Sequence, residues 1–195
     1  MKKYEFTGET KEIKLLFRTA VLHRIRATVS FGFVKIGDLG GWIEKEENLS
    51  HEGKAWVWGN AKVWGNAKVC GDAEVWGNAK VWGNAKVWGN AKVCGDAEVC
   101  GDAEVWGDAE VFSASHVLVI GAIGSRNDFT TFYRDKDNEI TVKCGCFLGK
   151  IDRFLEKVTQ THGDSKYALV YRAAVEVAKL QIDLLGEAPK DADEE

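Results

Sequence analysis

Apolar residues return at every sixth position through the middle of this chain. Valine occupies each of these positions from Val57 to Val111, and alanine follows at the fifth place of each hexad from Ala61 to Ala109. Within a hexad, the stretch Ala-Lys-Val-Trp alternates in the two-residue period of a β-strand. The pattern predicts that valine and alanine share an inward face. Lys or Glu and Trp or Cys are then expected to face outward.

The other two positions of each hexad, Gly-Asn or Gly-Asp, predict a corner. Glycine accepts unusual backbone dihedrals, and Asn and Asp tolerate the left-handed region better than other residues. A short strand and a corner, repeated, would wind the chain into a coil around a narrow core. Val117 and Ile123 continue the six-residue spacing after the last regular hexad. Before the first regular hexad, Leu39 and Ile43 follow the spacing only loosely.

These hexads resemble those of the hexapeptide-repeat family. In that family an aliphatic residue opens each hexad and a small residue sits four places later, as Val57 and Ala61 do here. The resemblance implies a left-handed parallel β-helix, a triangular prism with three hexads per coil. It is strong over residues 57–111 and extends over 37–123. Because this fold hosts unrelated activities, the resemblance indicates the fold class and says little about function.

Outward side chains of such a prism stack in columns, with neighbouring strands about 4.8 Å apart. Tryptophan columns on the outside have two interpretations. They stiffen the outer sheets, or they form a contact surface, since contiguous apolar patches mark contacts. The resemblance implies a homotrimer, which would cover them. The expected interface residues are Trp58, Trp64, Trp76, Trp82, Trp88 and Trp106.

The flanks predict three further regions around the mainly β centre. Residues 1–36 contain one alternating strand with a basic outer face and are expected to cap the first coil of the β-helix at 37–123. Residues 124–186 predict an α+β domain with a β-hairpin (128–133 and 139–144) and two amphipathic helices. The second helix is expected to stop at Gly186 and Pro189. The acidic tail, 187–195, is predicted to be disordered.

The whole arrangement is similar to phage and prophage proteins of undetermined function. Those proteins join a segment like Gly37–Glu44 to hexapeptide coils and end in segments like those at 123–127, 130–133 and 142–147 here. The resemblance implies a phage-related origin and, for a phage-encoded protein, the host cytosol. It carries no defined chemistry.

Composition narrows the function classes. The chain has 26 Lys+Arg against 30 Asp+Glu, a net charge of -4, which argues against a nucleic-acid binder. It has no run of about 18 apolar residues that would span a membrane, and its start lacks the apolar core of a signal peptide. Five cysteines without framework spacing predict reduced thiols in a cytoplasmic protein.

Many hexapeptide-repeat proteins are acyltransferases, so the resemblance also implies an alternative: an acetyl-CoA-dependent acyltransferase with His51 or His116 as the base. Those enzymes commonly interrupt their coils with long loops, whereas this chain runs unbroken from Val57 to Val111. A base also needs an orienting partner and a pocket, and the sequence shows neither. The histidines and cysteines have no close metal-ligand spacing. We therefore predict no catalytic residue, cofactor or metal site.

Copies of one hexad cannot supply a unique constellation, so specific chemistry is expected in the non-repeated parts. Arginine, asparagine and hydroxyl groups bind phosphate or carboxylate. The candidate ligand or partner residues are Arg126, Asn127, Thr130, Thr131, Tyr133 and His162. The alternative is that they cap the open end of the prism and satisfy its backbone groups. The expected function is a non-enzymatic scaffold that presents the C-terminal domain to a host protein or a small anionic ligand, such as a nucleotide signal in host defence.

Overall fold

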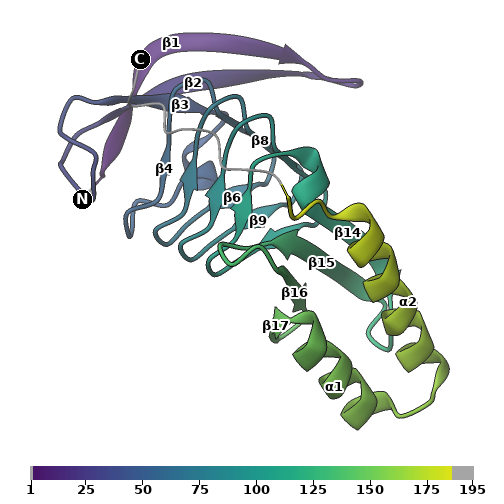
Figure 1. Ribbon diagram of the computed structural model, residues 1–195. Helices are drawn as coiled ribbons and strands as arrows, with labels where there is room; N and C mark the ends of the chain where they lie inside the picture. Colours follow the sequence, from purple (N-terminus) through teal and green to yellow (C-terminus); the bar gives the residue numbers. More distant parts are fainter. Residues whose placement is uncertain (1, 186–195) are drawn as a thin grey trace.

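The computed structural model describes residues 2–185. Along the chain, an N-terminal hairpin leads into a coil of short strands, which is followed by an antiparallel sheet and two helices (Figure 1). The protein is therefore mainly β, as the hexads predict, and ends in an α+β domain. Neither helix in this part of the chain has the length and apolar character needed to cross a membrane.

The coil is a parallel β-helix in which each short strand ends on the valine of one hexad. Each strand pairs in parallel with the strand three hexads later, so that residues 18 apart, such as Asn66 and Asn84, lie side by side. Over residues 39–111 these pairings make three faces, β3-β5-β8-β11, β4-β7-β10-β13 and β6-β9-β12, and they confirm the triangular prism. The strands are β3 (Leu39–Ile43), β4 (Trp56–Val57), β5 (Lys62–Val63), β6 (Lys68–Val69), β7 (Glu74–Val75), β8 (Lys80–Val81), β9 (Lys86–Val87), β10 (Lys92–Val93), β11 (Glu98–Val99), β12 (Glu104–Val105) and β13 (Glu110–Val111).

Valine and alanine fill the interior of the coil. Each hexad valine from Val57 to Val111 and each hexad alanine from Ala61 to Ala109 is fully buried, which confirms their inward assignment. The corner glycines adopt the left-handed backbone that the sequence predicts. At Gly89, with φ +82°, a Cβ would stand 2.9 Å from the backbone nitrogen of Gly107 in the next coil. At this corner the next coil therefore lies so close that there is no room for a side chain.

An N-terminal hairpin closes the first coil. β1 (Tyr4–Lys14) pairs antiparallel with β2 (Thr19–Ala27), and β2 continues the sheet of β3. The alternation within residues 1–36 predicts one strand, with Val21, Ile25 and Phe33 among the residues of its apolar face. The structure has two strands here, and Val21 and Phe33 are exposed whereas Ile25 is buried.

The prediction that alternate residues share one buried face fails for β2, because its first half is covered on one side and its second half on the other. Ala20 and Leu22 pack outside the prism against Trp42 and Trp64. Ile25, with the opposite parity, belongs to the core inside the prism. A single alternating pattern describes a strand with one covered face, and β2 has two.

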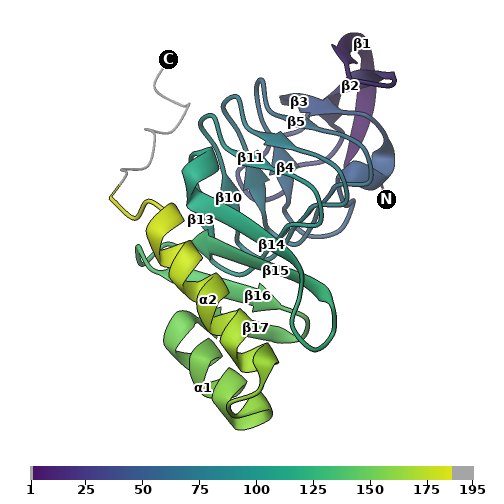
Figure 2. The ribbon, with the colours of Figure 1, turned by 90° about the vertical axis from the view of Figure 1, so that its right-hand side faces the viewer.

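The C-terminal domain is a four-stranded antiparallel sheet with two helices against it (Figure 2). The predicted hairpin and both predicted helices are present. The elements are β14 (Val117–Ile123), β15 (Asp128–Arg134), β16 (Ile140–Cys144), β17 (Phe147–Lys150), α1 (Ile151–His162) and α2 (Lys166–Gln181), and short 3₁₀ turns lie at η1 (Glu46–Asn48) and η2 (Ala114–His116).

The boundary between coil and domain differs from the expected one at residue 123. Val117–Ile123 forms the first strand of the antiparallel sheet and not a further coil. The physical reason is the missing corner: Ser113 and Val119 stand where earlier hexads have glycine. α2 ends at Gln181, before the predicted stop. The predicted stop signals at Gly186 and Pro189 and the predicted disordered tail, 187–195, lie outside the described residues.

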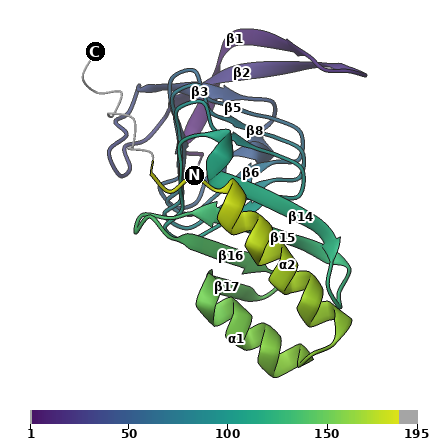
Figure 3. The same ribbon diagram turned by 45° about the vertical axis from the view of Figure 1, so that its right-hand side comes forward.

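The antiparallel sheet lies between the coil and the helices (Figure 3). Tyr133 faces the coil, belongs to its core and donates its hydroxyl to the Trp106 carbonyl at 2.9 Å. Phe132, its neighbour along the strand, faces the helices. The backbone N–H of Lys136 donates to the Asp108 carbonyl at 3.0 Å. One face of the sheet thus closes the open end of the prism.

Candidate functional site

A cleft of about 540 Å³ lies where the coil meets the C-terminal sheet. This volume is within the range of small-molecule sites in proteins. Both parts of the chain contribute to its walls, the coil through β9, β12 and the adjoining corners, and the sheet through β15, β16 and the turn after β16. The lining residues are Asn84, Lys86, Asp102, Glu104, Trp106, Asp128, Phe129, Thr131, Lys143 and Gly145.

Glu104 is the electrostatic centre of this cleft. Its carboxylate is 2.8 Å from Nζ of Lys86, one coil below, and 3.0 Å from Nζ of Lys143 in the sheet. Its backbone N–H donates to Oγ1 of Thr131 at 3.0 Å. Burial acts to raise the pKa of Glu104, but the two lysines outweigh it and hold the pKa below its ordinary value. Glu104 therefore joins the coil and the sheet as a carboxylate.

Aromatic rings form part of the cleft beside these charges. Nζ of Lys143 lies 4.6 Å from the ring centroid of Trp106, a cation–π contact, and this lysine is only 7% exposed. Trp88 stacks on Trp106 at 5.8 Å from the coil side. Phe129, on the sheet side, is 40% exposed. The cleft therefore offers an accessible ring close to buried and half-buried cations.

Arg126 comes from the turn between β14 and β15 and lies beside the cleft. It is exposed, and its Nη1 would stand 2.5 Å from a Cβ built on Gly145, so its guanidinium lies against the backbone of that lining residue. Thr131 lines the cleft directly. Of the six predicted ligand residues, one therefore lines the cleft and one contacts its wall.

The other four predicted residues lie elsewhere. Thr130 is buried on the helix side of the sheet and donates to Sγ of Cys144 at 3.3 Å. His162 stacks on Tyr171 at the end of α1, with 5.8 Å between ring centroids. Asn127 takes a left-handed backbone, φ 51°, in its turn. Together with Tyr133, which closes the prism, these residues are held by contacts within the fold.

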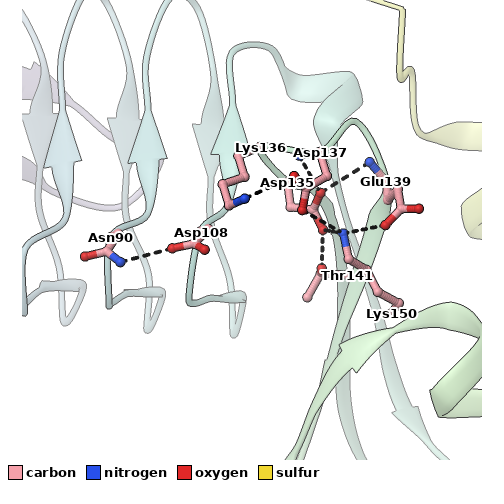
Figure 4. A network of polar contacts seen from close by, with 8 residues as sticks. All are labelled: Asn90, Asp108, Asp135, Lys136, Asp137, Glu139, Thr141 and Lys150. Carbon is pink, nitrogen blue, oxygen red and sulfur yellow. Dashed lines mark hydrogen bonds and ion pairs between the residues drawn. The ribbon is translucent and has the colours of Figure 1, made fainter.

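A smaller hollow of about 200 Å³ opens beside Trp106, around a polar network centred on Asp135 (Figure 4). The Asp135 carboxylate accepts from Lys150 Nζ and from the Thr141 hydroxyl, both at 2.5 Å. Lys150 also pairs with Glu139 at 2.7 Å. This network holds the loop between β15 and β16 against the last coil. The hollow has less than half the volume of the cleft beside Glu104, so it is the weaker binding candidate.

The cleft has to be interpreted from its own residues. No protein-family model matches the sequence, and no curated protein matches it. Within residues 2–185, no three His, Cys, Asp or Glu side chains are grouped so that they could hold a metal ion. The binding groups that the cleft offers are cations, carboxylates, a hydroxyl and aromatic rings.

Sequence reasoning missed the part of this cleft that comes from the repeats. It placed specific chemistry outside the hexads, whereas Lys86, Glu104 and Trp106 all belong to them. The signal was present in the 18-residue columns, which put Lys86 directly below Glu104. Lys143, from β16, could not be foreseen because its position depends on how the sheet meets the coil.

The six tryptophans expected at an interface are placed differently from one another. Trp64 stacks on Trp82 at 5.1 Å and with an interplanar angle of 3°, so the predicted ladder is present on this face. Trp64 is also 6% exposed because the N-terminal hairpin covers it. Lys143 covers Trp106. Trp58 and Trp76 are partly buried, and Trp88 is 48% exposed.

The two candidate base histidines hold backbone at opposite ends of the coil. Nδ1 of His51 accepts from the Lys3 N–H at 3.3 Å, and its ring stacks on Tyr4 at 4.3 Å. Nδ1 of His116, which is 3% exposed, accepts from the Phe112 N–H at 3.1 Å. Burial lowers the pKa of both histidines.

Proposed function

We propose that this protein is a non-enzymatic binding scaffold that holds a small anionic ligand in the cleft between the coil and the C-terminal sheet. The observation that carries the proposal is the convergence of Lys86, Thr131 and Lys143 on one cleft of about 540 Å³, with Arg126 against its lining residue Gly145. Cations and hydroxyl groups are the donors that proteins use for phosphate and carboxylate.

A nucleotide is the ligand class that this lining favours. Lys86 and Lys143 line the cleft and Arg126 lies beside it, but Asp102, Glu104 and Asp128 line it as well, so a bare anion would meet repulsion together with attraction. A nucleotide carries an anionic phosphate, which suits Arg126 and Lys86, and amino and ribose hydroxyl donors, which suit the carboxylates. Its base would lie against Phe129, which is partly exposed.

The coil would serve this function as a rigid support. Each turn contacts only its neighbours, and a stack of hexads with a fully buried valine and alanine core holds its end in one position. The cleft is therefore positioned by the prism and not by mobile loops. In a phage setting, sequestration of a nucleotide signal would interfere with host defence.

The acyltransferase alternative finds no supporting observation at its candidate bases. His51 and His116 each accept a backbone N–H through Nδ1, and neither lines the cleft. The proposal predicts that the protein binds ligand without turning over acetyl-CoA. Turnover that is abolished by His51→Ala or His116→Ala would overturn it.

Calorimetric titration of the full chain tests the ligand class. The probes are adenosine and guanosine mono- and triphosphates, cyclic mono- and dinucleotides, and inorganic phosphate. We expect at least one nucleotide to bind and phosphate alone to bind much more weakly. Arg126→Ala and Lys86→Met should each weaken that binding about tenfold, the effect of losing one charge-assisted hydrogen bond.

Lys80→Met is the matched control. Lys80 makes the same 2.8 Å ion pair with a glutamate one coil above it, Glu98, but on another face of the prism. Its removal should leave nucleotide affinity unchanged. If Arg126→Ala and Lys86→Met bind as the wild type does, the cleft is not the ligand site. If native mass spectrometry of protein from its host shows only a bound protein partner, the small-ligand proposal fails.

A further inference from the structure

α2 has two apolar faces, and its own chain covers only one of them. The inward face, with Tyr171 and Val175, packs against the sheet and α1. The outward face carries Leu169, 58% exposed, and Leu180, 89% exposed, with Val177 between them. The members of this outward stripe are Leu169, Val170, Ala173, Val177 and Leu180, spaced so that they share one side of a helix.

α1 shows that this exposure is particular to α2. The two helices lie side by side on the same sheet (Figure 2). The exposed residues of α1 are polar, with Asp152, Arg153, Glu156 and Lys157 among them. A helix that is apolar on both faces is typical of a buried element. The outward side of α2 therefore has the composition of a contact surface.

We propose that the outward stripe of α2 pairs with the same stripe of a second copy of this chain, with the two helices antiparallel about a two-fold axis near Val175. In this arrangement Leu169 lies opposite the partner's Leu180, and Ala173 lies opposite the partner's Val177. The small side chain of Ala173 lets the helices approach at the centre. The contact runs over about three turns, or roughly 16 Å of helix.

The charges beside the stripe favour this occupant. Arg172 and Glu176 lie one turn apart on the same flank of the stripe. Same flanks face each other in an antiparallel pair, so Arg172 would meet the partner's Glu176, twice per dimer. Within the described part of its own chain Arg172 lies 3.8 Å from Asp164 and at 3.3–3.4 Å from the Thr159 hydroxyl and the Gly163 carbonyl, and Glu176 pairs with Lys179 at 3.0 Å. In the dimer the Arg172 guanidinium would exchange its 3.8 Å approach to Asp164, which is fully exposed, for the partner's Glu176. The flank is therefore self-complementary.

The composition of the chain after α2 does not match the outward stripe. Residues 186–195, Gly-Glu-Ala-Pro-Lys-Asp-Ala-Asp-Glu-Glu, include no large apolar side chain. Burial of leucine and valine is most favourable against other apolar side chains. The α2 helix of a second copy presents an apolar stripe of the same length, and its flank places opposite charges against Arg172 and Glu176. A second copy is therefore the occupant that the residues of α2 favour.

The test is the mass of the full-length protein in solution, measured by sedimentation equilibrium over a range of concentrations. We expect a mass of two chains for the wild type, in place of the three chains of the homotrimer that the hexapeptide resemblance implies, and one chain for Leu180→Glu and Val177→Glu. Both side chains are exposed, so the fold should survive, and circular dichroism checks this. Phe17→Glu, at a 93% exposed position on the N-terminal hairpin, is the control and should remain a dimer.

A charge swap tests the antiparallel register. Arg172→Glu and Glu176→Arg should each weaken dimerisation about tenfold, because the ion pair occurs twice, and the double swap should restore it. Unchanged association in both single variants would overturn the register. A wild type that stays monomeric at high concentration, or an oligomer unaffected by Leu180→Glu, would overturn the interface. None of these outcomes depends on nucleotide binding.

Discussion

At the scale of single residues, Glu104 links the repeat to the non-repeated domain. Its folded-state pKa lies below the ordinary value of 4.5, held there against burial by Lys86 and Lys143. A carboxyl whose pKa falls on folding contributes stability that is fully present above its unfolded pKa. That stability is lost as the pH falls through the folded pKa.

We therefore expect Glu104→Gln to destabilise the protein at pH 7, with a difference that shrinks below about pH 4.5. Denaturant unfolding at pH 7 and pH 3.5 measures it. Glu98→Gln is the control, because Glu98 pairs with Lys80 alone and should lose less. A difference from the wild type that stays constant from pH 7 to pH 3.5 would contradict this account of Glu104.

The corner glycines give a second prediction at this scale. A Cβ at Gly89 would stand 2.9 Å from the Gly107 nitrogen, whereas a Cβ at Gly59 would meet no atom within 4 Å. Both have positive φ, so alanine at either costs about 1–2 kcal/mol of backbone strain. Gly89→Ala should cost about 1–3 kcal/mol more, from overpacking.

Chemical unfolding of the two alanine variants gives this comparison. The excess cost at Gly89 reports the stacking of one corner on the next coil, since backbone strain is common to both sites. Equal losses for Gly59→Ala and Gly89→Ala would mean that the corners do not stack as closely as the structure places them.

At the scale of elements, the N-terminal hairpin is as much a part of the core as the coil. Leu22 is fully buried against Trp42 and Trp64, whereas its neighbour Val21 is 40% exposed. We expect Leu22→Ala to lower the free energy of unfolding by about 2–5 kcal/mol. Val21→Ala should lower it by much less.

Thermal and denaturant unfolding of both hairpin variants distinguishes a core element from a loose appendage. A Leu22→Ala loss no larger than that of Val21→Ala would show that the hairpin does not seal the tryptophan column.

The elements also show what sequence patterns can predict. The six-residue period correctly predicts which residues point into the coil, because the valine and alanine of every hexad meet the same interior. It does not predict β1, whose long polar strand is held by its pairing with β2. The period also predicts, wrongly, that the coil continues to Ile123. Val117 and Ile123 keep the six-residue spacing, but Ser113 and Val119 stand at the positions of the corner glycines.

Only the part of the candidate site that comes from the C-terminal domain could be predicted from the sequence. Arg126 and Thr131 are candidates because they stand outside the repeat; Thr131 lines the cleft, and Arg126 lies against its lining residue Gly145. Lys86 and Glu104 belong to the hexads, which look alike, and only the placement of Lys143 beside them makes that face of the coil different. A local pattern cannot show which face of a prism its cap will meet.

At the scale of the whole molecule, the coil and the C-terminal sheet meet along one boundary. We call it the seam, and its residues include Glu104, Trp106, Asp108, Thr131, Tyr133 and Lys136. Tyr133 joins the coil core, and hydrogen bonds run both ways across the boundary, from Tyr133 to Trp106 and from Glu104 to Thr131. The cleft lies in that seam. If the two parts open and close together, the cleft is preformed and ligand binding needs no assembly step.

Residue-resolved hydrogen exchange tests this claim most directly. The Trp82 amide, bonded to the Val99 carbonyl at 3.0 Å, reports the coil. The amides of Lys136 and Glu104, bonded to Asp108 and Thr131, report the seam. The account predicts the same free energy of opening for all three amides, as expected of one cooperative unit. Seam amides that open at a much lower free energy than Trp82 would contradict it.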